Sequence, residues 1–128
     1  MSGVELTEPQ LDFVRARHLA TLTTLRPDGT PHVVPVAFTW DAARGLARVT
    51  THRGSVKVRN ATGGVRAALC QVEGLRWLTL EGTARVSEEH DEIARAVAAY
   101  AERYRELEPN PERVVLLLEV DRVMGSVR

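Results

Sequence analysis

The sequence predicts a mainly β domain of the α+β class, in which a small antiparallel barrel or strongly coiled sheet carries flanking helices. Strand-like runs joined by mostly short, turn-rich connections favour antiparallel pairing. Helical patterns interrupt them at the start, near the middle and before the last strand. A chain of 128 residues, 44% of them hydrophobic, is long enough for one core. We therefore expect a single domain over residues 1–128.

The expected strands cover residues 18–26, 31–41, 46–52, 65–73, 75–87 and 113–123. The first two form a hairpin around the turn "PDGT", and the fourth and fifth pair through the turn at Glu73 and Gly74. Pro35 cannot donate to a ladder, so its strand is expected at a sheet edge or with a bulge at that point. The continuous apolar run of the last strand predicts burial on both faces and a central position.

Three helices are expected. The first, in "LTEPQLDFVRARH", opens with Thr7 and Gln10 in the form of a capping box. A short second helix begins near Ser55 and ends at the glycine pair of residues 63–64, which can supply a C-cap. The third begins near Ser87, which can cap it, and its expected apolar face contains Ile93, Val97, Tyr100 and Tyr104. We expect a solvated helix N-terminus, rather than catalytic carboxylates, at Glu88, Glu89, Asp91 and Glu92.

The charges balance. Seventeen acidic side chains match seventeen basic ones, so no global field favours nucleic acid or an anionic membrane. We therefore expect partners to be small molecules or a second copy of the chain. The first ten residues contain no basic segment followed by an apolar run, and no stretch is apolar enough to span a membrane. These features predict a cytoplasmic protein.

The cysteine and histidine patterns indicate neither a disulfide nor a metal site. Cys70 is the only cysteine and is expected to be buried as a small hydrophobic residue. The four histidines lack the i,i+4 spacing of a metal-binding pair, so no metal site is expected at His18, His32, His52 or His90.

Lys57 is the only lysine in a chain that carries sixteen arginines. With Ser55 it occupies the first turn of the short second helix, where free backbone N–H groups and the helix dipole favour an anion. A lysine ammonium is a compact charge on a flexible stem and can reach a phosphate from beneath, whereas arginine prefers a planar approach. The alternative is a solvated helix residue in a chain whose arginine content reflects genomic composition.

The strand over residues 75–87 carries a tryptophan on its polar face. Alternation predicts a core face made of Arg76, Leu78, Leu80, Gly82, Ala84 and Val86. It places on the opposite face Trp77, Thr79, Glu81, Thr83 and Arg85. An exposed aromatic residue beside charged groups often marks a ligand groove or a subunit interface. The alternative is that a second sheet or a helix covers this face.

Four collinear segments carry a family resemblance: "LATLTTLRPDGTPHVVPVAFTWD", "RVTTHRGSVKVRN", "RWLTLEGTARV" and "RVVLLLEVDRVMGS". They resemble the pyridoxamine-phosphate-oxidase-like split β-barrel flavoproteins. They are more similar to the actinobacterial deazaflavin-dependent branch, and most similar to its coenzyme F420-dependent biliverdin reductases. The resemblance covers almost the whole chain and implies a homodimeric split β-barrel with two sites at the subunit interface.

The resemblance also implies a cofactor site. The strand matching "HVVPV" would lie along the tricyclic ring through His32, Val33, Val34 and Pro35. The segment matching "RGSVK" would hold the cofactor phosphate, in agreement with the anion site inferred above, through Arg53, Gly54, Ser55, Val56 and Lys57. Further contacts would come from Thr50 and Thr51 beside the phosphate or ribityl chain, Asn60 nearby, and Trp77 at the dimer cleft.

The implied chemistry is that of reduced F420, which passes a hydride to a planar conjugated acceptor such as biliverdin. The protein would bind, orient and exclude water, so no catalytic protein residue is expected. The propionates of a tetrapyrrole would need cationic partners, and the candidates by charge are Arg76, Arg113 and Arg122.

Two alternatives stay open. The first is an FMN-dependent oxidase or reductase of the same fold. Members that use FMN often have an arginine two residues before the matching lysine, where this chain has Ser55, although Arg53 is close enough in sequence to reach in. The second is a non-catalytic protein that binds a flavin, a tetrapyrrole or haem without turnover.

Overall fold

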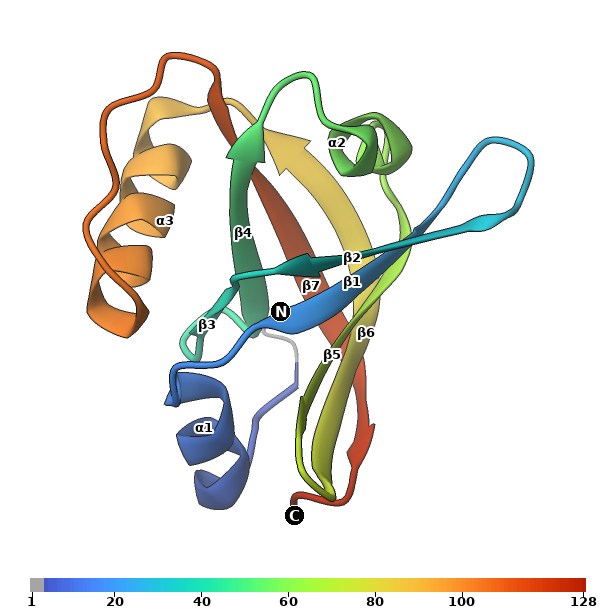
Figure 1. Cartoon of the computed structure of the whole chain (residues 1–128), viewed down its shortest axis with the longest axis vertical. Coiled ribbons are helices and arrows are strands. Elements are labelled where there is room, and N and C mark those ends of the chain that lie inside the picture. The colour runs from blue at the N-terminus through green and yellow to red at the C-terminus, as the bar shows by residue number, and fades with distance from the viewer. Residues whose placement is uncertain (1–3) are drawn as a thin grey trace.

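The chain forms one antiparallel sheet that curls into a barrel, with three helices placed around it (Figure 1). The computed structural model describes residues 4–128. Residues 1–3, the start of the expected domain, lie outside the described residues. The helices are α1 (Glu8–Arg15), α2 (Val56–Ala61) and α3 (His90–Arg103). The strands are β1 (Ala20–Leu25), β2 (Pro31–Val36), β3 (Thr39–Asp41), β4 (Leu46–His52), β5 (Val65–Glu73), β6 (Arg76–Ser87) and β7 (Arg113–Gly125).

The strand order requires the sheet to close on itself. Across the sheet the order is β2-β1-β5-β6-β7-β4-β3, so β2 and β3 stand at opposite edges. Along the chain, however, only Ala37 and Phe38 separate Val36 of β2 from Thr39 of β3. Three residue steps span at most about 11 Å, so the two edges must approach each other. This confirms the predicted barrel-like, mainly β fold.

The prediction of one strand over residues 31–41 is wrong. The chain leaves β2 after Val36 and enters β3 at Thr39, because it crosses from one sheet edge to the other. Phe38, in the crossing, is 1% exposed and belongs to the main core. The prediction for Pro35 is confirmed, since β2 is an edge strand.

The first two helices follow their sequence signals. In α1 the Thr7 backbone N–H donates to Gln10 Oε1 at 2.9 Å, and the Gln10 N–H donates to Thr7 Oγ1 at 3.3 Å, which confirms the capping box. Ser55 precedes α2 as predicted, but the C-cap of α2 is Thr62 rather than a glycine of the pair at residues 63–64. Within residues 4–128, no helix is long and apolar enough to cross a lipid bilayer.

The predictions for α3 are wrong in two respects. The helix starts at His90, and Ser87 instead ends β6, where its hydroxyl accepts a hydrogen bond from the Glu89 N–H at 3.2 Å. The fully buried residues of α3 are Glu92 and Ala96, whereas the four residues of the expected apolar face are only half-buried: Ile93, Val97, Tyr100 and Tyr104. Compared with the expected orientation, α3 is rotated so that Glu92 faces the sheet, where Arg44 and Arg48 hold it.

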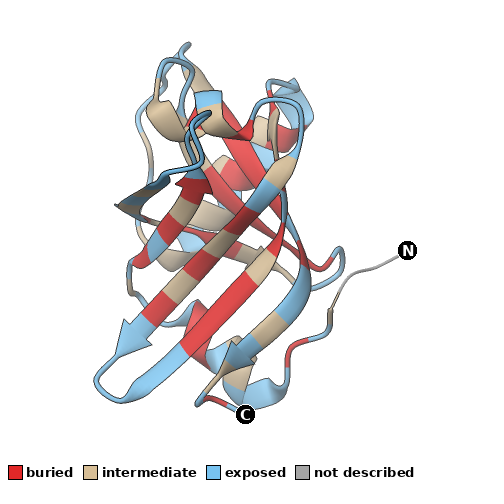
Figure 2. Cartoon of the chain, turned by 90° about the vertical axis from the view of Figure 1, so that its right-hand side faces the viewer, coloured by how far each residue is buried: buried red, intermediate tan, exposed pale blue. Residues whose placement is uncertain are grey.

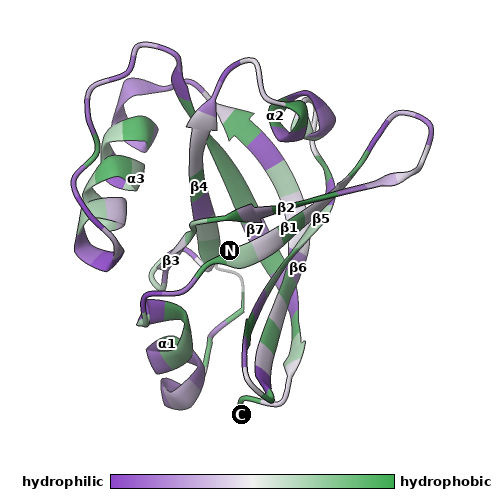
Figure 3. Ribbon diagram, viewed as in Figure 1, coloured by the Kyte–Doolittle hydropathy of each residue, from purple (hydrophilic) through white to green (hydrophobic). Residues whose placement is uncertain are grey.

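The last strand is central, as predicted. β7 lies between β6 and β4, and residues 114–118 are fully buried. Figure 2 shows buried residues in red along the strands of the barrel, and in Figure 3 much of β7 is green, which marks hydrophobic residues. Leu116 and Leu118 join the main core inside the barrel, while Val115 and Leu117 pack with Leu46 and Ala96 under α3. A strand with apolar neighbours on both faces needs a continuous apolar run, which explains "VVLLL".

The predicted core face of β6 is mostly confirmed. The buried residues are Leu78, Leu80, Gly82 and Ala84, with Val86 half-buried. Arg76 is an exception, because it is exposed and stacks its guanidinium 4.9 Å from the ring centroid of Phe13. The prediction for Cys70 is also wrong, since it is only half-buried and lies on the opposite face of β5 from the core residue Leu69.

Candidate cofactor site

The turn between β4 and α2 brings two hydroxyl groups to the start of a helix. Ser55 is the N-cap residue of α2, but its side chain makes no capping hydrogen bond. Its Oγ lies 3.2 Å from Oγ1 of Thr51, near the end of β4. The N–H groups of the first turn of α2 are therefore left without a side-chain acceptor. Hydroxyl and backbone donors converge at this point, as an anion site requires.

Lys57 places a positive charge beside these donors. Its side chain is half-buried, and burial lowers the pKa of its ammonium. Within residues 4–128, no carboxylate lies within ion-pair distance of the Lys57 ammonium, and no hydrogen bond holds it. A half-buried charge without a partner lowers the free energy of unfolding, and a bound anion would offset this loss.

The side of α2 that carries Lys57 also carries a residue that is bonded to β1. Asn60 lies three residues after Lys57, on the same side of the helix. Its Nδ2 donates a hydrogen bond to Oγ1 of Thr24 at 3.0 Å. Thr24 is 1% exposed and stands directly opposite His32 in the ladder between β1 and β2. The helix, β1 and the edge strand β2 thus form one corner.

His32 supplies an unsatisfied polar atom in this corner. Its Nδ1 is buried and has no hydrogen-bond partner among the described residues. A buried polar atom of this kind calls for a partner that is absent from the bare chain. The orphaned imidazole nitrogen, the unpaired ammonium and the free helix N–H groups together fit an anionic cofactor with a polar ring edge.

The other residues expected along β2 divide between two faces. Val34 lies on the same side as His32, whereas Val33 and Pro35 are exposed on the other side. Only one edge of β2 is paired, with β1, so its other backbone edge has no neighbouring strand in the described sheet. That edge is available to a planar ligand.

Arg53 was expected to contact the cofactor phosphate, but in this structure its guanidinium is paired with carboxylates. Its Nη2 lies 3.0 Å from a carboxylate oxygen of Glu88, and its Nη1 lies 3.4 Å from a carboxylate oxygen of Glu112. Gly54 is exposed, and its carbonyl accepts a hydrogen bond from Arg59 Nη1 at 2.9 Å. The arginine charge is therefore matched by two carboxylates outside the corner.

Within one chain, Trp77 lies far from Lys57. It is the second residue of β6, whereas α2 lies beside the opposite end of that strand (Figure 1). A groove there is lined by residues that include Val58, Arg59, Arg85 and Val86. Trp77 is 37% exposed. The remaining expected residues, Thr50 and Val56, are half-buried on β4 and at the first position of α2.

The three arginines considered for an acidic acceptor do not form a cluster. Arg76 lies 3.7 Å from Glu73, and Arg113 Nη2 donates to the Glu108 carbonyl at 2.7 Å. Arg113 and Arg122 are nine residues apart along β7, which corresponds to about 30 Å. One chain alone therefore does not offer these arginines to a single small acceptor.

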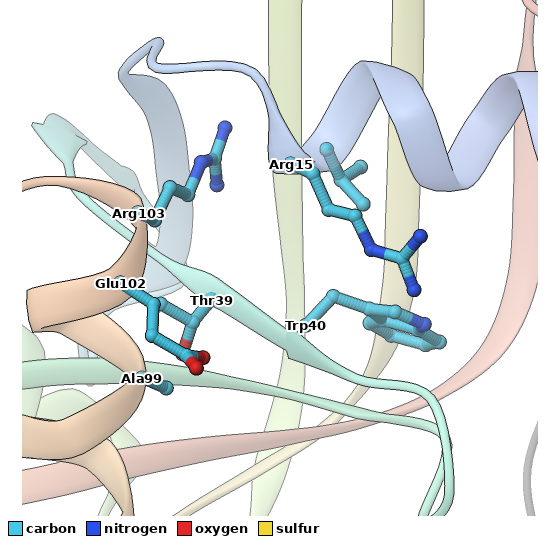
Figure 4. Close-up of a pocket in the computed structure, with 7 residues that line it drawn as sticks. Arg15, Thr39, Trp40, Ala99, Glu102 and Arg103 are labelled. Carbon is cyan, nitrogen blue, oxygen red and sulfur yellow. The ribbon is translucent and has the colours of Figure 1, made fainter.

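A separate cavity of about 300 Å³ lies between α1, β3 and α3 (Figure 4). It contains none of the expected site residues and is lined by Val14, Arg15, Thr39, Trp40, Ala99, Glu102 and Arg103. Arg103 is a structural residue here. It donates to the carbonyls of Ala16, His18 and Phe38 and to Oε1 of Gln71, which ties α1, β5 and the crossing between β2 and β3 to α3.

Sequence reasoning missed Thr24 and Arg103. A weak signal for Thr24 existed, because it shares the alternation of the core residues Ala20 and Leu22, and a threonine at a core position needs a hydrogen-bond partner. Nothing local marks Arg103, since its four acceptors lie between 32 and 87 residues away in the sequence.

The chain matches a known family. Residues 6–125 match the model of the pyridoxamine 5′-phosphate oxidase family. The chain belongs to this family, which confirms the predicted resemblance. It is also 50% identical over 121 residues to a Mycobacterium tuberculosis protein named F420H(2)-dependent biliverdin reductase, and the match covers 94% of this chain and 88% of the relative.

Solved structures support the same fold. A conserved hypothetical protein of Mycobacterium tuberculosis superposes with a TM-score of 0.80 at 23% identity, covering 98% of this chain and 87% of the other. A structure described as an F420 reductase superposes with a TM-score of 0.76 at 21% identity, covering 93% and 98%. At these identities the likeness concerns the fold alone.

Proposed function

We propose that this protein is an F420-dependent oxidoreductase that reduces biliverdin or a similar conjugated compound. The observation that carries the proposal is the half-buried, unpaired Lys57 ammonium at the start of α2, in a corner that also holds the orphaned Nδ1 of His32. The identity of 50% to a protein named as an F420H(2)-dependent biliverdin reductase supports both the cofactor and the acceptor.

Each part of the corner would have a distinct task. Lys57, Ser55, Thr51 and the first N–H groups of α2 would hold the phosphate of the cofactor. His32 and the free edge of β2 would contact its ring. When bound, F420 supplies the hydride. The protein supplies binding, orientation and the exclusion of water, so no acid, base or nucleophile of the chain is required.

The proposal includes a homodimer in which Trp77 borders the site of a second copy. Alternation and strand pairing put Val72, Trp77 and Met124 on one outer face, and these side chains are 57%, 37% and 46% exposed. Light scattering after gel filtration is expected to give twice the mass of the chain. A monomeric mass at micromolar concentration would remove Trp77 from the proposed site.

The activity test is oxidation of reduced F420 under anaerobic conditions, with and without biliverdin. The proposal predicts oxidation that depends on both the protein and biliverdin. Cofactor binding without acceptor-dependent oxidation would instead support a non-catalytic binding protein. A yellow protein that binds FMN and reacts with oxygen when reduced would support the FMN alternative.

The expected cytoplasmic location is also part of the proposal. Fractionation of the native cells, followed by immunoblotting, should recover the protein with the cytoplasmic fraction, and its recovery outside the cell would contradict this expectation.

A further inference from the structure

Within residues 4–128, one side-chain hydrogen bond joins the body of α2, residues 56–61, to the sheet. The helix has six residues, too few to be stable without tertiary contacts. Among the described residues, its side chains donate hydrogen bonds from Arg59 to the adjoining turn and from Asn60 to Thr24 of β1, so only the second reaches the sheet. Val58 and Ala61 are buried and dock the helix by apolar packing. The bond between Asn60 and Thr24 is the polar contact that links the Lys57 side of the helix to β1.

The hydrogen-bonding capacity of the Thr24 hydroxyl is only partly used. A hydroxyl has one hydrogen to donate and two lone pairs. In the structure one lone pair accepts from Asn60, and within residues 4–128 the hydroxyl donates to no acceptor. Thr24 is 1% exposed, so solvent does not supply one. The hydroxyl hydrogen needs an acceptor inside the protein.

A ring nitrogen that can accept this hydrogen lies opposite. His32 faces Thr24 across the β1–β2 ladder, and directly opposed side chains have Cβ atoms about 4.5–5.5 Å apart. Nδ1 of His32 is buried and has no partner among the described residues. The unused hydroxyl hydrogen and the unused ring nitrogen therefore lie on the same side of the same two strands.

We propose that Thr24 is a positioning residue that couples His32 to the Lys57 helix. Its hydroxyl accepts from Asn60 and, when the corner closes on its ligand, donates to Nδ1 of His32. A neutral imidazole that accepts at Nδ1 must carry its hydrogen on Nε2, so Nε2 becomes a fixed donor toward the cofactor ring. This inference rests on the proposed function, because it concerns how that same corner holds F420.

The test compares Thr24→Val, which removes the hydroxyl at nearly constant shape, with Thr24→Ser, which keeps it. Thr23→Val is the matched control, because Thr23 precedes Thr24 but points to the opposite face of β1. F420 affinity is measured by fluorescence titration. We expect about a tenfold loss for Thr24→Val, in the range of one hydrogen bond, and near-native affinity for Thr24→Ser and Thr23→Val.

The second readout is the tautomer of His32, followed by NMR of protein labelled with ¹⁵N-histidine and saturated with F420. The His32 signals are assigned as those lost in His32→Gln. We expect one tautomer, with hydrogen on Nε2, in the wild type and Thr24→Ser, and a mixture of tautomers in Thr24→Val. A purely structural role for Thr24 would change stability without changing the tautomer.

The outcomes separate this inference from the proposed function. Failure of the wild type to bind F420 would overturn both. Normal F420 binding by Thr24→Val, with His32 still in a single tautomer, would overturn only the positioning role. If Thr24→Val fails to fold, Thr24→Ser still tests the proposal, because a mixture of His32 tautomers with the hydroxyl retained would contradict it.

Discussion

At the scale of single residues, the half-buried Lys57 ammonium destabilises the apoprotein and would gain a partner when an anionic ligand binds. Burial lowers the pKa of its ammonium, which means that the folded chain disfavours the charged form. The resulting loss of folding stability depends on pH. The cost is present at pH values below the lowered pKa, and it is relieved as the pH rises through that value. A residue that destabilises the apoprotein in this way is expected to serve binding.

Replacing Lys57 should therefore separate binding from stability. Lys57→Ala is expected to weaken F420 binding by about 1.5–3 kcal/mol, the range for a charged hydrogen bond, while the apoprotein unfolds at an unchanged or slightly higher temperature. Lys57→Arg is the matched variant that retains the charge but changes its shape, and we expect only partial recovery. Equal F420 affinity of Lys57→Ala and the wild type would exclude the phosphate assignment.

At the scale of elements, α3 is anchored by a buried ionic network that the sequence does not indicate. Arg48 of β4 lies 2.8 Å from Asp41 and 3.3 Å from Glu92, and Arg44 lies 2.8 Å from Glu92. Arg48 is 5% exposed and Glu92 is 7% exposed. The charge run at the start of α3 was expected to be solvated, but Glu92 faces the sheet and replaces an apolar contact.

Removing one partner of this network should be costly. Glu92→Gln leaves the guanidinium of Arg48 buried with only Asp41, and we expect a loss of about 3 kcal/mol of unfolding free energy, measured by urea titration. Glu89→Gln is the control, because Glu89 is exposed and its side chain makes no capping bond. Equal losses in the two variants would show that the network does not anchor α3.

The same network predicts a dependence of stability on pH. Burial by itself raises the pKa of Asp41 and of Glu92, but hydrogen bonds and charges from Arg48 and Arg44 outweigh burial and leave both pKa values below their ordinary range. The network therefore stabilises the fold above the ordinary carboxyl values, and this stabilisation is lost as the pH falls through the lowered ones. The stability difference between wild type and Glu92→Gln should shrink below about pH 4. A difference independent of pH would contradict this.

Local elements were predictable where the signal lies within a few neighbouring residues. The capping box of α1, the "PDGT" turn, the central β7 and the Ser55–Lys57 segment are of this kind. The rotation of α3 was not predictable, because it depends on Arg44 and Arg48 reaching Glu92 across more than forty residues. The break in the strand over residues 31–41 was not predictable either, since it follows from closure of the sheet.

At the scale of the whole molecule, β6 and β7 come into very close contact at two glycines, Gly82 and Gly125. The register between these strands shifts between Glu81 and Gly82. A Cβ atom at Gly82 would collide with the backbone carbonyl of Glu119. The strand pair at the centre of the sheet therefore requires glycine at this position.

Gly82→Ala should destabilise the fold by at least about 2 kcal/mol, the scale of overpacking in a core, measured by thermal or urea unfolding. Gly54→Ala is the matched control for stability, because a Cβ at Gly54 meets no atom within 4 Å. Native stability of Gly82→Ala would show that the strands do not pack as closely as the structure has them.

In the candidate site, too, some features could be predicted from neighbouring residues and others depend on contacts between distant parts of the chain. The proposed anion-binding segment at the start of α2 was predicted from its own residues, while the family resemblance implied His32 on β2. The link through Thr24 could not be predicted, because it needs the pairing of β1 with β2 and the docking of α2 on β1. The distance of Trp77 from Lys57 within one chain also depends on the complete barrel.

The central claim is that the corner between α2 and β2 binds F420. The most direct measurement is a fluorescence titration of the purified wild type and Lys57→Ala with F420 and, separately, with FMN at matched ionic strength. We predict micromolar or tighter binding of F420 by the wild type, weaker binding of FMN, and a clear loss of F420 affinity in Lys57→Ala. Preferential binding of FMN, or binding of neither compound, would contradict the proposed function.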